Sequence, residues 1–99
     1  MDKNWHAINV LKYGDTVGLS VGVASSSVQL PTGVTAQTIV RVSSNTDCYI
    51  ALGGSGVTAT SSDPLFLAGV EYITIAPGQT HIAALRVGVN GVLTVTEVY

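Results

Sequence analysis

The chain has 99 residues, a formal net charge of −2 and only 10% charged residues. A chain of this length supports one hydrophobic core, so we expect a single domain over residues 1–99. Four cations cannot form the basic surface that follows nucleic-acid phosphates, which excludes nucleic acid as a partner. No stretch approaches the roughly 20 apolar residues of a membrane span. The first ten residues lack the apolar run of a signal peptide, so we expect a cytoplasm-like compartment and no membrane partner.

The low charge content predicts that part of the surface is covered. Average soluble domains contain about 25% charged residues, and this chain has less than half of that share. Few charges are therefore available to keep an exposed surface solvated. We expect a permanent assembly; the alternative is that Ser, Thr and Gly residues solvate the surface.

Every element that the sequence predicts is a β-strand. Val, Thr, Ile, Gly and Ser are abundant, and no segment has the spacing of three and four that apolar residues follow in a helix. We therefore predict an all-β fold, a small antiparallel β-sandwich or jelly-roll-like domain. Residues 1–13 are a candidate N-terminal arm, because neither face of their alternation is cleanly apolar. Tyr13-Gly14-Asp15 is typical of a turn.

The clearest strand covers residues 16–23. Val17, Leu19, Val21 and Val23 alternate there with small or polar residues, which predicts one buried face. Residues 25–30 continue in extended conformation.

After the turn residues Pro31-Thr32-Gly33, two further strands are predicted at 37–43 and 48–52. The polar segment 44–47 connects them, so we predict a hairpin. Cys48 alternates with Ile50 and Leu52, which indicates a buried, reduced thiol.

A glycine-rich segment interrupts the strand pattern after residue 52. Residues 53–64 are small and polar, so we predict an excursion loop. The short apolar patch Leu65-Phe66-Leu67 follows it. The last third, residues 71–98, is predicted as three consecutive strands in a meander. Pro77-Gly78 suits a type II turn between the first two, because Gly tolerates the positive φ of its third position.

Two registers compete for the last turn of this meander. A two-residue loop would leave both strand faces mixed. A three-residue loop that ends at Gly91, with that residue at positive φ, would pair Val87 with Leu93 and Leu85 with Val95. This register gives one apolar face, so we predict that these four residues are buried together.

A five-residue motif in the first clear strand matches the nucleophile elbow of hydrolases. Gly18-Leu19-Ser20-Val21-Gly22 fits GxSxG, and Asp47 or Asp63 followed by His81 supplies the order Ser, Asp, His. The elbow requires a strand that turns sharply into a helix, whereas the alternation here continues through the glycines. We therefore predict no catalytic role for Ser20 and no enzymatic activity.

The sequence does not predict phosphate or metal sites either. Gly53-Gly54-Ser55-Gly56 is not followed by Lys-Ser or Lys-Thr, which a phosphate loop requires. His6, Cys48 and His81 are too widely spaced in the sequence to indicate a zinc site. We expect no cofactor and no bound metal.

Residues 38–98 combine RVSSNTDCYIALGG, a loop rich in Ser, Thr and Ala, and PLFLAGVEYITIAPGQTHIAALRVGVNGVLTVTEV. This succession resembles a pattern found in small structural proteins of tailed bacteriophages. The resemblance implies a virion protein without enzymatic chemistry, made in the host cytoplasm. It would be a capsid decoration (cement) protein or, alternatively, a neck or tail accessory subunit. The implied partners are further copies of the chain, a trimer by analogy with decoration proteins at threefold positions, and the major capsid protein or another virion protein.

Aromatic and apolar residues are the candidate contacts with these partners. The interface candidates are Trp5, Ile8, Leu11, Tyr13, Phe66 and Tyr99. The N-terminal segment is a candidate to order against a neighbouring subunit or the shell. The alternative function is a carbohydrate-binding module, in which aromatic residues such as Trp5, Tyr49 or Tyr72 would contact sugar rings.

Overall fold

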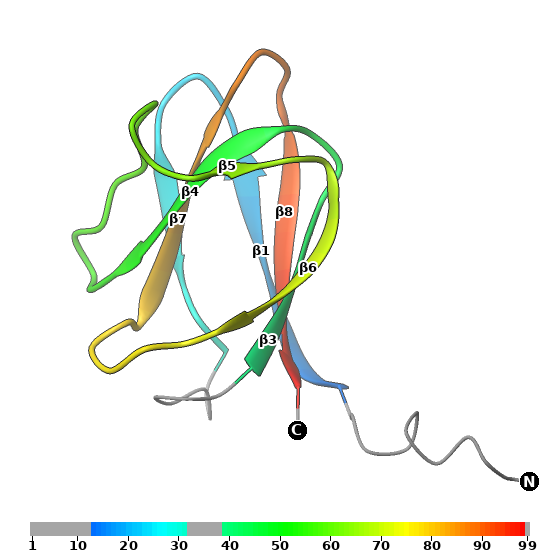
Figure 1. Ribbon diagram of the computed structural model, residues 1–99, viewed down its shortest axis with the longest axis vertical. Helices are drawn as coiled ribbons and strands as arrows, with labels where there is room; N and C mark the ends of the chain where they lie inside the picture. Colours follow the sequence, from blue (N-terminus) through cyan, green and yellow to red (C-terminus); the bar gives the residue numbers. More distant parts are fainter. Residues whose placement is uncertain (1–12, 32–38, 99) are drawn as a thin grey trace, which may run out of the picture.

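The computed structural model describes residues 13–31 and 39–98, and every regular element in these ranges is a β-strand (Figure 1). The strands are β1 (Tyr13–Val21), β2 (Ser26–Gln29), β3 (Ile39–Ser44), β4 (Cys48–Gly53), β5 (Leu65–Phe66), β6 (Gly69–Thr74), β7 (His81–Arg86) and β8 (Gly91–Val98). The prediction of an all-β domain is confirmed. Residues 1–12, and with them most of the candidate N-terminal arm, lie outside the described residues.

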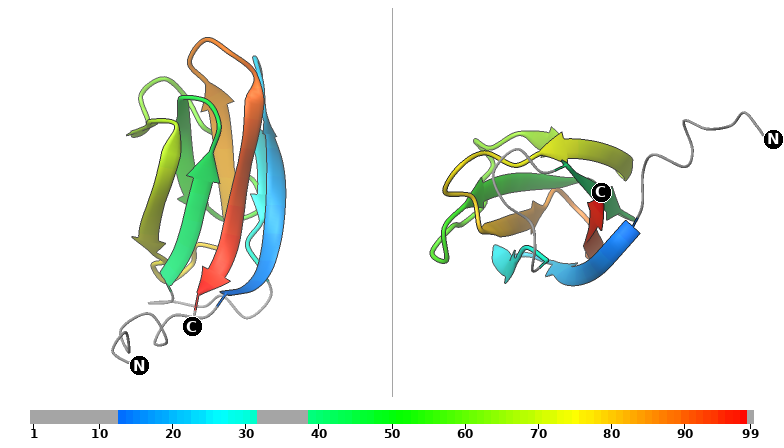
Figure 2. Two further views of the ribbon diagram at one scale, coloured as in Figure 1. Left: turned by 90° about the vertical axis from the view of Figure 1, so that its right-hand side faces the viewer. Right: turned by 90° about the horizontal axis from the view of Figure 1, so that it is seen from below.

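The strands form two antiparallel sheets of four, which pack face to face (Figure 2). The strand order is β1-β8-β3-β6 in the first, here called sheet A, and β2-β7-β4-β5 in the second, sheet B. Strands pair from the two ends of the chain inward: β1 with β8, β2 with β7, β3 with β6 and β4 with β5. This is a long antiparallel hairpin rolled into a sandwich, the topology of a jelly roll.

Two expectations about neighbouring strands are wrong. Residues 37–43 and 48–52 do not form a hairpin, because β3 pairs with β6 and β8 while β4 pairs with β5 and β7. Residues 71–98 are not a meander, because β6 and β8 lie in sheet A and β7 lies in sheet B. Turn residues reverse the chain direction, but they do not decide whether the flanking strands share a ladder. Here the β3–β4, β6–β7 and β7–β8 connections each cross from one sheet to the other, so the strands that they join face a common core.

The predicted pairs of the last turn therefore do not occur. Leu93 and Val95 are fully buried, as expected, but their partners are residues of β1 and β3. Leu85 lies in sheet B and is only half-buried. Val87 follows the end of β7 and is exposed.

Gly78 has the positive φ expected of a type II turn, +85°. The Gln79 N–H donates a hydrogen bond to the Ala76 carbonyl at 3.2 Å, and the Gln79 side-chain oxygen accepts one from the Ala76 N–H at 2.7 Å. The turn is thus confirmed, although it joins β6 in one sheet to β7 in the other.

Gly91 was expected at positive φ, and this is wrong: the described glycines with positive φ are Gly69 and Gly78. Gly91 is needed for a different reason. A Cβ atom at this position would lie 2.8 Å from Cβ of Thr46 and would also overlap the Asn45 side chain. Thr46 cannot easily move away, because its hydroxyl donates a hydrogen bond to the Val89 carbonyl at 2.9 Å.

The beginning of the described chain also departs from the expectation. Tyr13-Gly14-Asp15 is not a turn, because β1 begins at Tyr13, and the candidate arm of residues 1–13 therefore ends within a strand. The pairing with β8 shifts between Tyr13 and Thr16, as at a β-bulge. Val23 is exposed rather than buried, since β1 ends at Val21.

The inner faces of the two sheets enclose the hydrophobic core. Its most buried large side chains are Val21, Val40, Val42, Cys48, Phe66, Ile75, Ile82, Leu93 and Val95. Burying side chains of this kind stabilises the fold by roughly 1.5–3 kcal/mol each. Cys48 is a free thiol with no exposed surface, which confirms the predicted buried position. Burial raises its pKa, and its Sγ lies 3.9 Å from Oγ of Ser44.

The segment between β4 and β5 is the excursion loop that its composition predicted. It is attached to the sandwich at Ala59, which is buried and whose N–H donates to Oγ of Ser25 at 2.8 Å. Near its end, a carboxylate oxygen of Asp63 accepts the Thr60 N–H at 2.7 Å.

Candidate functional site

The outer face of sheet A carries the candidate site. Residues directly opposite one another in an antiparallel pair point to the same side of a sheet. The register therefore places Thr16, Thr96, Arg41 and Tyr72 in one row across all four strands. Tyr13, Val98, Ile39 and Thr74 form the next row, toward the end of the sheet at which β8 finishes.

This face retains large apolar and aromatic surface in water. Tyr13, Ile39, Val70, Tyr72 and Val92 lie on it and are between 41% and 61% exposed. The other exposed large hydrophobic residues that the structure describes belong to loops or to the short β5 region. Apolar side chains gathered on one face, rather than scattered singly, are typical of interaction sites.

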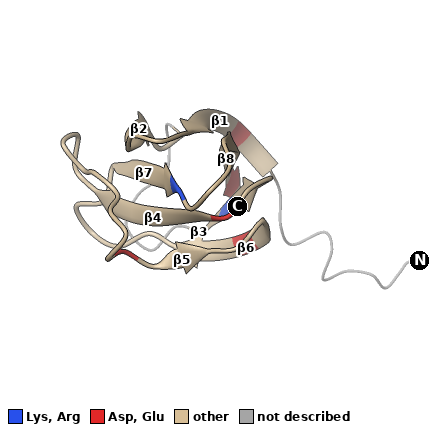
Figure 3. Ribbon diagram, turned by 90° about the horizontal axis from the view of Figure 1, so that it is seen from above, with Lys and Arg blue, Asp and Glu red and all other residues tan. Residues whose placement is uncertain are grey.

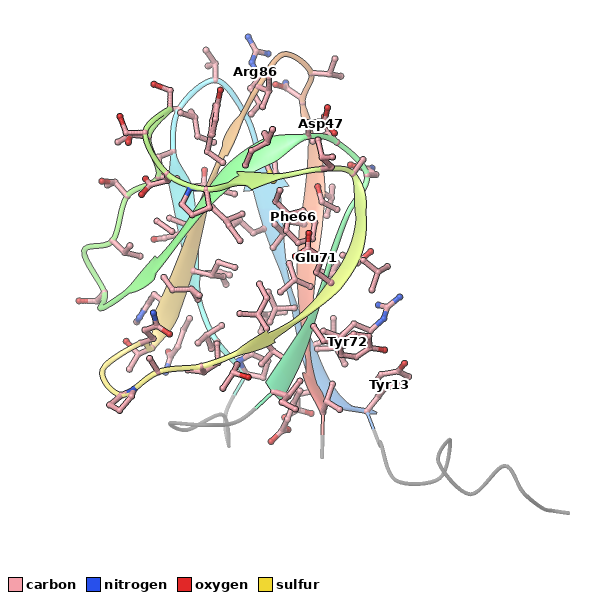
Figure 4. All side chains as sticks on the ribbon, in the orientation of Figure 1. Tyr13, Asp47, Phe66, Glu71, Tyr72 and Arg86 are labelled. Atoms are coloured by element: carbon pink, nitrogen blue, oxygen red, sulfur yellow. The ribbon has the colours of Figure 1, made fainter. Side chains whose placement is uncertain are left out.

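Two tyrosines meet above this sheet. Tyr13 belongs to β1 and Tyr72 to β6, the two edge strands of sheet A, yet their hydroxyl oxygens are only 3.2 Å apart. Figure 4 shows the two side chains approaching one another. Both side chains therefore reach over the strands between them, β8 and β3. Thr96 of β8 belongs to the same outward-facing row and is buried.

Arg41, in β3, lies beside the two tyrosines. Its Cζ atom lies 5.9 Å from the centroid of the Tyr13 ring, within the range of a cation–π interaction. The hydroxyls of Thr16 and Thr96 are hydrogen-bonded at 2.8 Å. Tyr13, Thr16, Arg41 and Thr96 line a hollow of about 170 Å³. We call these four residues and Tyr72 the Arg41 cluster.

The electrostatics of the cluster favour a neutral Tyr13 beside a permanent cation. The hydrogen bond to Tyr72 and the repulsion of a second phenolate raise the pKa of Tyr13, while the charge of Arg41 acts in the opposite direction. Arg41 and Arg86 are the cations within the described ranges, 13–31 and 39–98. They are on different sheets (Figure 3), and the Arg86 guanidinium donates to Oδ1 of Asn90 at 2.7 Å.

The interface candidates from the sequence fall into three groups. Tyr13 is exposed and belongs to the Arg41 cluster. Phe66 is wrong as an interface residue: it pairs with Cys48 across β5 and β4, points inward and is 2% exposed. Trp5, Ile8, Leu11 and Tyr99 lie outside the described residues.

Sequence reasoning missed Arg41 as a site residue, and it weighed Tyr72 among the aromatics for sugar contacts or interface anchors without retaining it as an interface candidate. Arg41 lies between the buried residues Val40 and Val42, which marks it as outward-facing. Tyr72 is paired with Arg41 and therefore shares its face of the sheet. What brings them to Tyr13 is the strand order β1-β8-β3-β6, which local pattern does not contain.

A second hollow, of about 420 Å³, opens beside the short strand β5. Phe66 and Ile73 contribute apolar surface, while Asp63, Glu71 and Gln79 supply polar groups. Glu71 occupies an inward-facing position on the edge strand β6, opposite the buried Val42. An inward charge on an edge strand opposes pairing with another chain, which gives Glu71 a structural role.

The residues of the GxSxG motif are not assembled with His81. Ser20 lies in β1, which runs unbroken through the motif to Val21, and is paired with Val92. His81 is the first residue of β7, and Arg86 is the last. The end of β7 near the motif is the Arg86 end, where the Arg86 N–H donates a hydrogen bond to the Gly22 carbonyl at 3.1 Å. Five strand residues, about 16 Å, separate these two ends.

Searches against protein-family models, curated proteins and solved structures found no match to this chain. Within the described part of the chain, no group of three or more His, Cys, Asp or Glu residues could hold a metal ion. The same residues contain no helix long and apolar enough to cross a membrane.

Proposed function

We propose that this protein is a non-enzymatic structural protein of a tailed-bacteriophage virion, which decorates the assembled head and stabilises it. The observation that carries the proposal is the outer face of sheet A, where exposed apolar and aromatic residues surround Arg41. The resemblance of residues 38–98 to phage structural proteins supports it. So does the topology, because jelly rolls are common among viral capsid domains.

The size of this face indicates what else must contribute to docking. Four strands of about six residues present roughly 19 × 20 Å, or about 400 Å² of projected area. A standard interface buries about 800 Å² on each partner. Residues 1–12 precede Tyr13 directly in the chain and contain Trp5, Ile8 and Leu11. We propose that they supply the remaining contact.

We further propose that the chain acts as a homo-oligomer. A domain this small, with 10% charged residues, has little stability to spare, and association stabilises the folded form by mass action. A trimer is the preferred state, by analogy with decoration proteins at threefold positions of a shell. A neck or tail accessory subunit is the alternative location.

The test uses the full-length chain and a variant that lacks Met1 to Lys12. Light scattering should give an oligomer for the full-length protein, which should co-sediment with purified phage heads in a fixed number of copies per particle. The truncated variant should keep its far-ultraviolet circular dichroism and lose particle binding. A monomer at working concentration, together with full particle binding by the truncated protein, would contradict both proposals.

A carbohydrate-binding module is the second candidate, and one observation favours it. The exposed Tyr13 and Tyr72 rings lie beside Arg41 and the Thr16 hydroxyl, a mixture of stacking surfaces and hydrogen-bonding groups that suits a sugar. Tyr49, by comparison, is half-buried. A glycan array followed by calorimetry tests this function. Specific sugar binding that is lost in Tyr72→Ala would replace the first proposal.

A further inference from the structure

The Arg41 cluster has an excess of hydrogen-bond donors. In the Tyr13–Tyr72 bond one hydroxyl donates and the other accepts, so the hydrogen of the accepting tyrosine remains available. The same holds for the Thr16–Thr96 bond. The Arg41 guanidinium adds N–H groups that can only donate. The hollow between these residues therefore fits a group that only accepts hydrogen bonds and carries negative charge.

The size of the hollow limits what that group can belong to. Its volume of about 170 Å³ is below the range of about 300–1,000 Å³ for small-molecule pockets. It equals the volume of roughly six water molecules at about 30 Å³ each, which accommodates the end of one side chain. A free oligosaccharide would extend well beyond it.

We infer that the Arg41 cluster receives an Asp or Glu carboxylate from the head surface on which the protein docks. This inference rests on the proposed function and names the chemistry of its partner. A guanidinium binds a carboxylate through two parallel N–H···O bonds, a geometry that Lys cannot reproduce. Tyr13 and Tyr72 would exclude water around the pair, as aromatic residues do around the strongest contacts of an interface.

Charge complementarity supports this occupant. Within the described ranges, Arg41 is the cation of sheet A, and the residues that line the hollow with it are aromatic or hydroxylic. The carboxylate of Asp15 is also exposed on β1, but it is not among the lining residues. A cation in such surroundings selects partners that offer one carboxylate in an otherwise apolar surface. It disfavours partners that offer another cation.

The experiment compares particle binding by four full-length proteins: the unaltered chain, Arg41→Gln, Arg41→Lys and Arg86→Gln. Arg86→Gln is the matched control, because it removes one positive charge from the other sheet. Circular dichroism and thermal unfolding confirm that each variant is folded. We expect Arg41→Gln to bind heads at least about 30-fold more weakly, Arg41→Lys to fall between it and the unaltered chain, and Arg86→Gln to bind within twofold of the unaltered chain.

The outcomes separate this inference from the proposed function. If the unaltered chain does not bind heads at all, the proposed function fails. If it binds and Arg41→Gln binds equally well, the carboxylate inference is overturned while the proposed function stands. If Arg41→Gln instead dissociates the oligomer in light scattering, the carboxylate belongs to a second copy of the chain. If acidic glycans bind the unaltered chain but not Arg41→Gln, the occupant is a sugar; either result overturns the assignment to the head surface.

Discussion

The two faces of sheet A share the same four strands and differ in what covers them. On the inner face, Val42, Leu93 and Val95 have no exposed surface. On the outer face, Tyr13 and Tyr72 keep about half or more of their surface in water. Both faces are rich in apolar side chains, yet only the inner set is covered by the fold. The difference indicates that inner residues hold the sandwich together, whereas the outer residues are available to a partner.

The largest effect that should distinguish the two faces comes from consecutive residues of β8. Leu93→Ala removes a fully buried side chain and should lower the free energy of unfolding by about 2–5 kcal/mol. Val92→Ala, on the exposed outer side, should change it by less than about 0.5 kcal/mol. Urea unfolding measures both values. Similar losses for the two variants would contradict the assignment of the faces.

A smaller loss is expected at the start of β8. Gly91→Ala places a Cβ atom against Thr46 and Asn45, and should cost about 1–3 kcal/mol through overpacking. Gly54→Ala is the control, since a Cβ there meets nothing within 4 Å. An unchanged urea midpoint for Gly91→Ala would contradict this prediction, because it would show that residues 45–46 can move aside to accommodate the added Cβ atom.

Cys48 tests whether the inner face is closed in solution. Its thiol has no exposed surface, and burial raises its pKa, so little reactive thiolate reaches the solvent. We expect maleimide to label the denatured protein and to leave the native protein unmodified on the same time scale. Rapid labelling of the native protein would place this side of β4 outside the core.

The smallest effect concerns the outer face alone. The hydrogen bond between Tyr13 and Tyr72 raises the pKa of Tyr13 above its ordinary value of 10.0. A raised pKa means that the folded state favours the neutral phenol, so this stabilisation is present below pH 10 and is lost as the pH rises through the raised pKa. Phenolate absorbance, with Tyr13→Phe subtracted, should show Tyr13 titrating at a higher pH in the unaltered chain than in Tyr72→Phe. Equal titration in both proteins would contradict the contact.

The sequence predicts much of the fold's local structure. Period-two alternation located the strand at Val17 to Val21, and Pro77-Gly78 identified a turn with the required positive φ. The alternation also identified Leu93 and Val95 as buried. These features depend on residues close together in the chain, and such residues carry their own conformational preferences.

Strand partners could not be predicted in the same way. Val95 pairs with Val17 and Val42, which are more than 50 residues away, and a local hairpin with Leu85 gives an equally apolar face. The candidate site also depends on which strands are neighbours in the sheet. Tyr13 was predicted as a contact residue, but Arg41 joins it only because β8 inserts between β1 and β3.

Protection of the tyrosines in the assembled particle tests the central claim most directly, namely that the outer face of sheet A docks on the head. Chemical nitration followed by peptide mass spectrometry compares the free protein with the same protein on purified particles. Tyr13 and Tyr72 should be modified in the free protein and protected on the particle, while Tyr49 in sheet B should be modified to the same extent in both. Equal modification of Tyr13 and Tyr72 in the two states would contradict docking through this face.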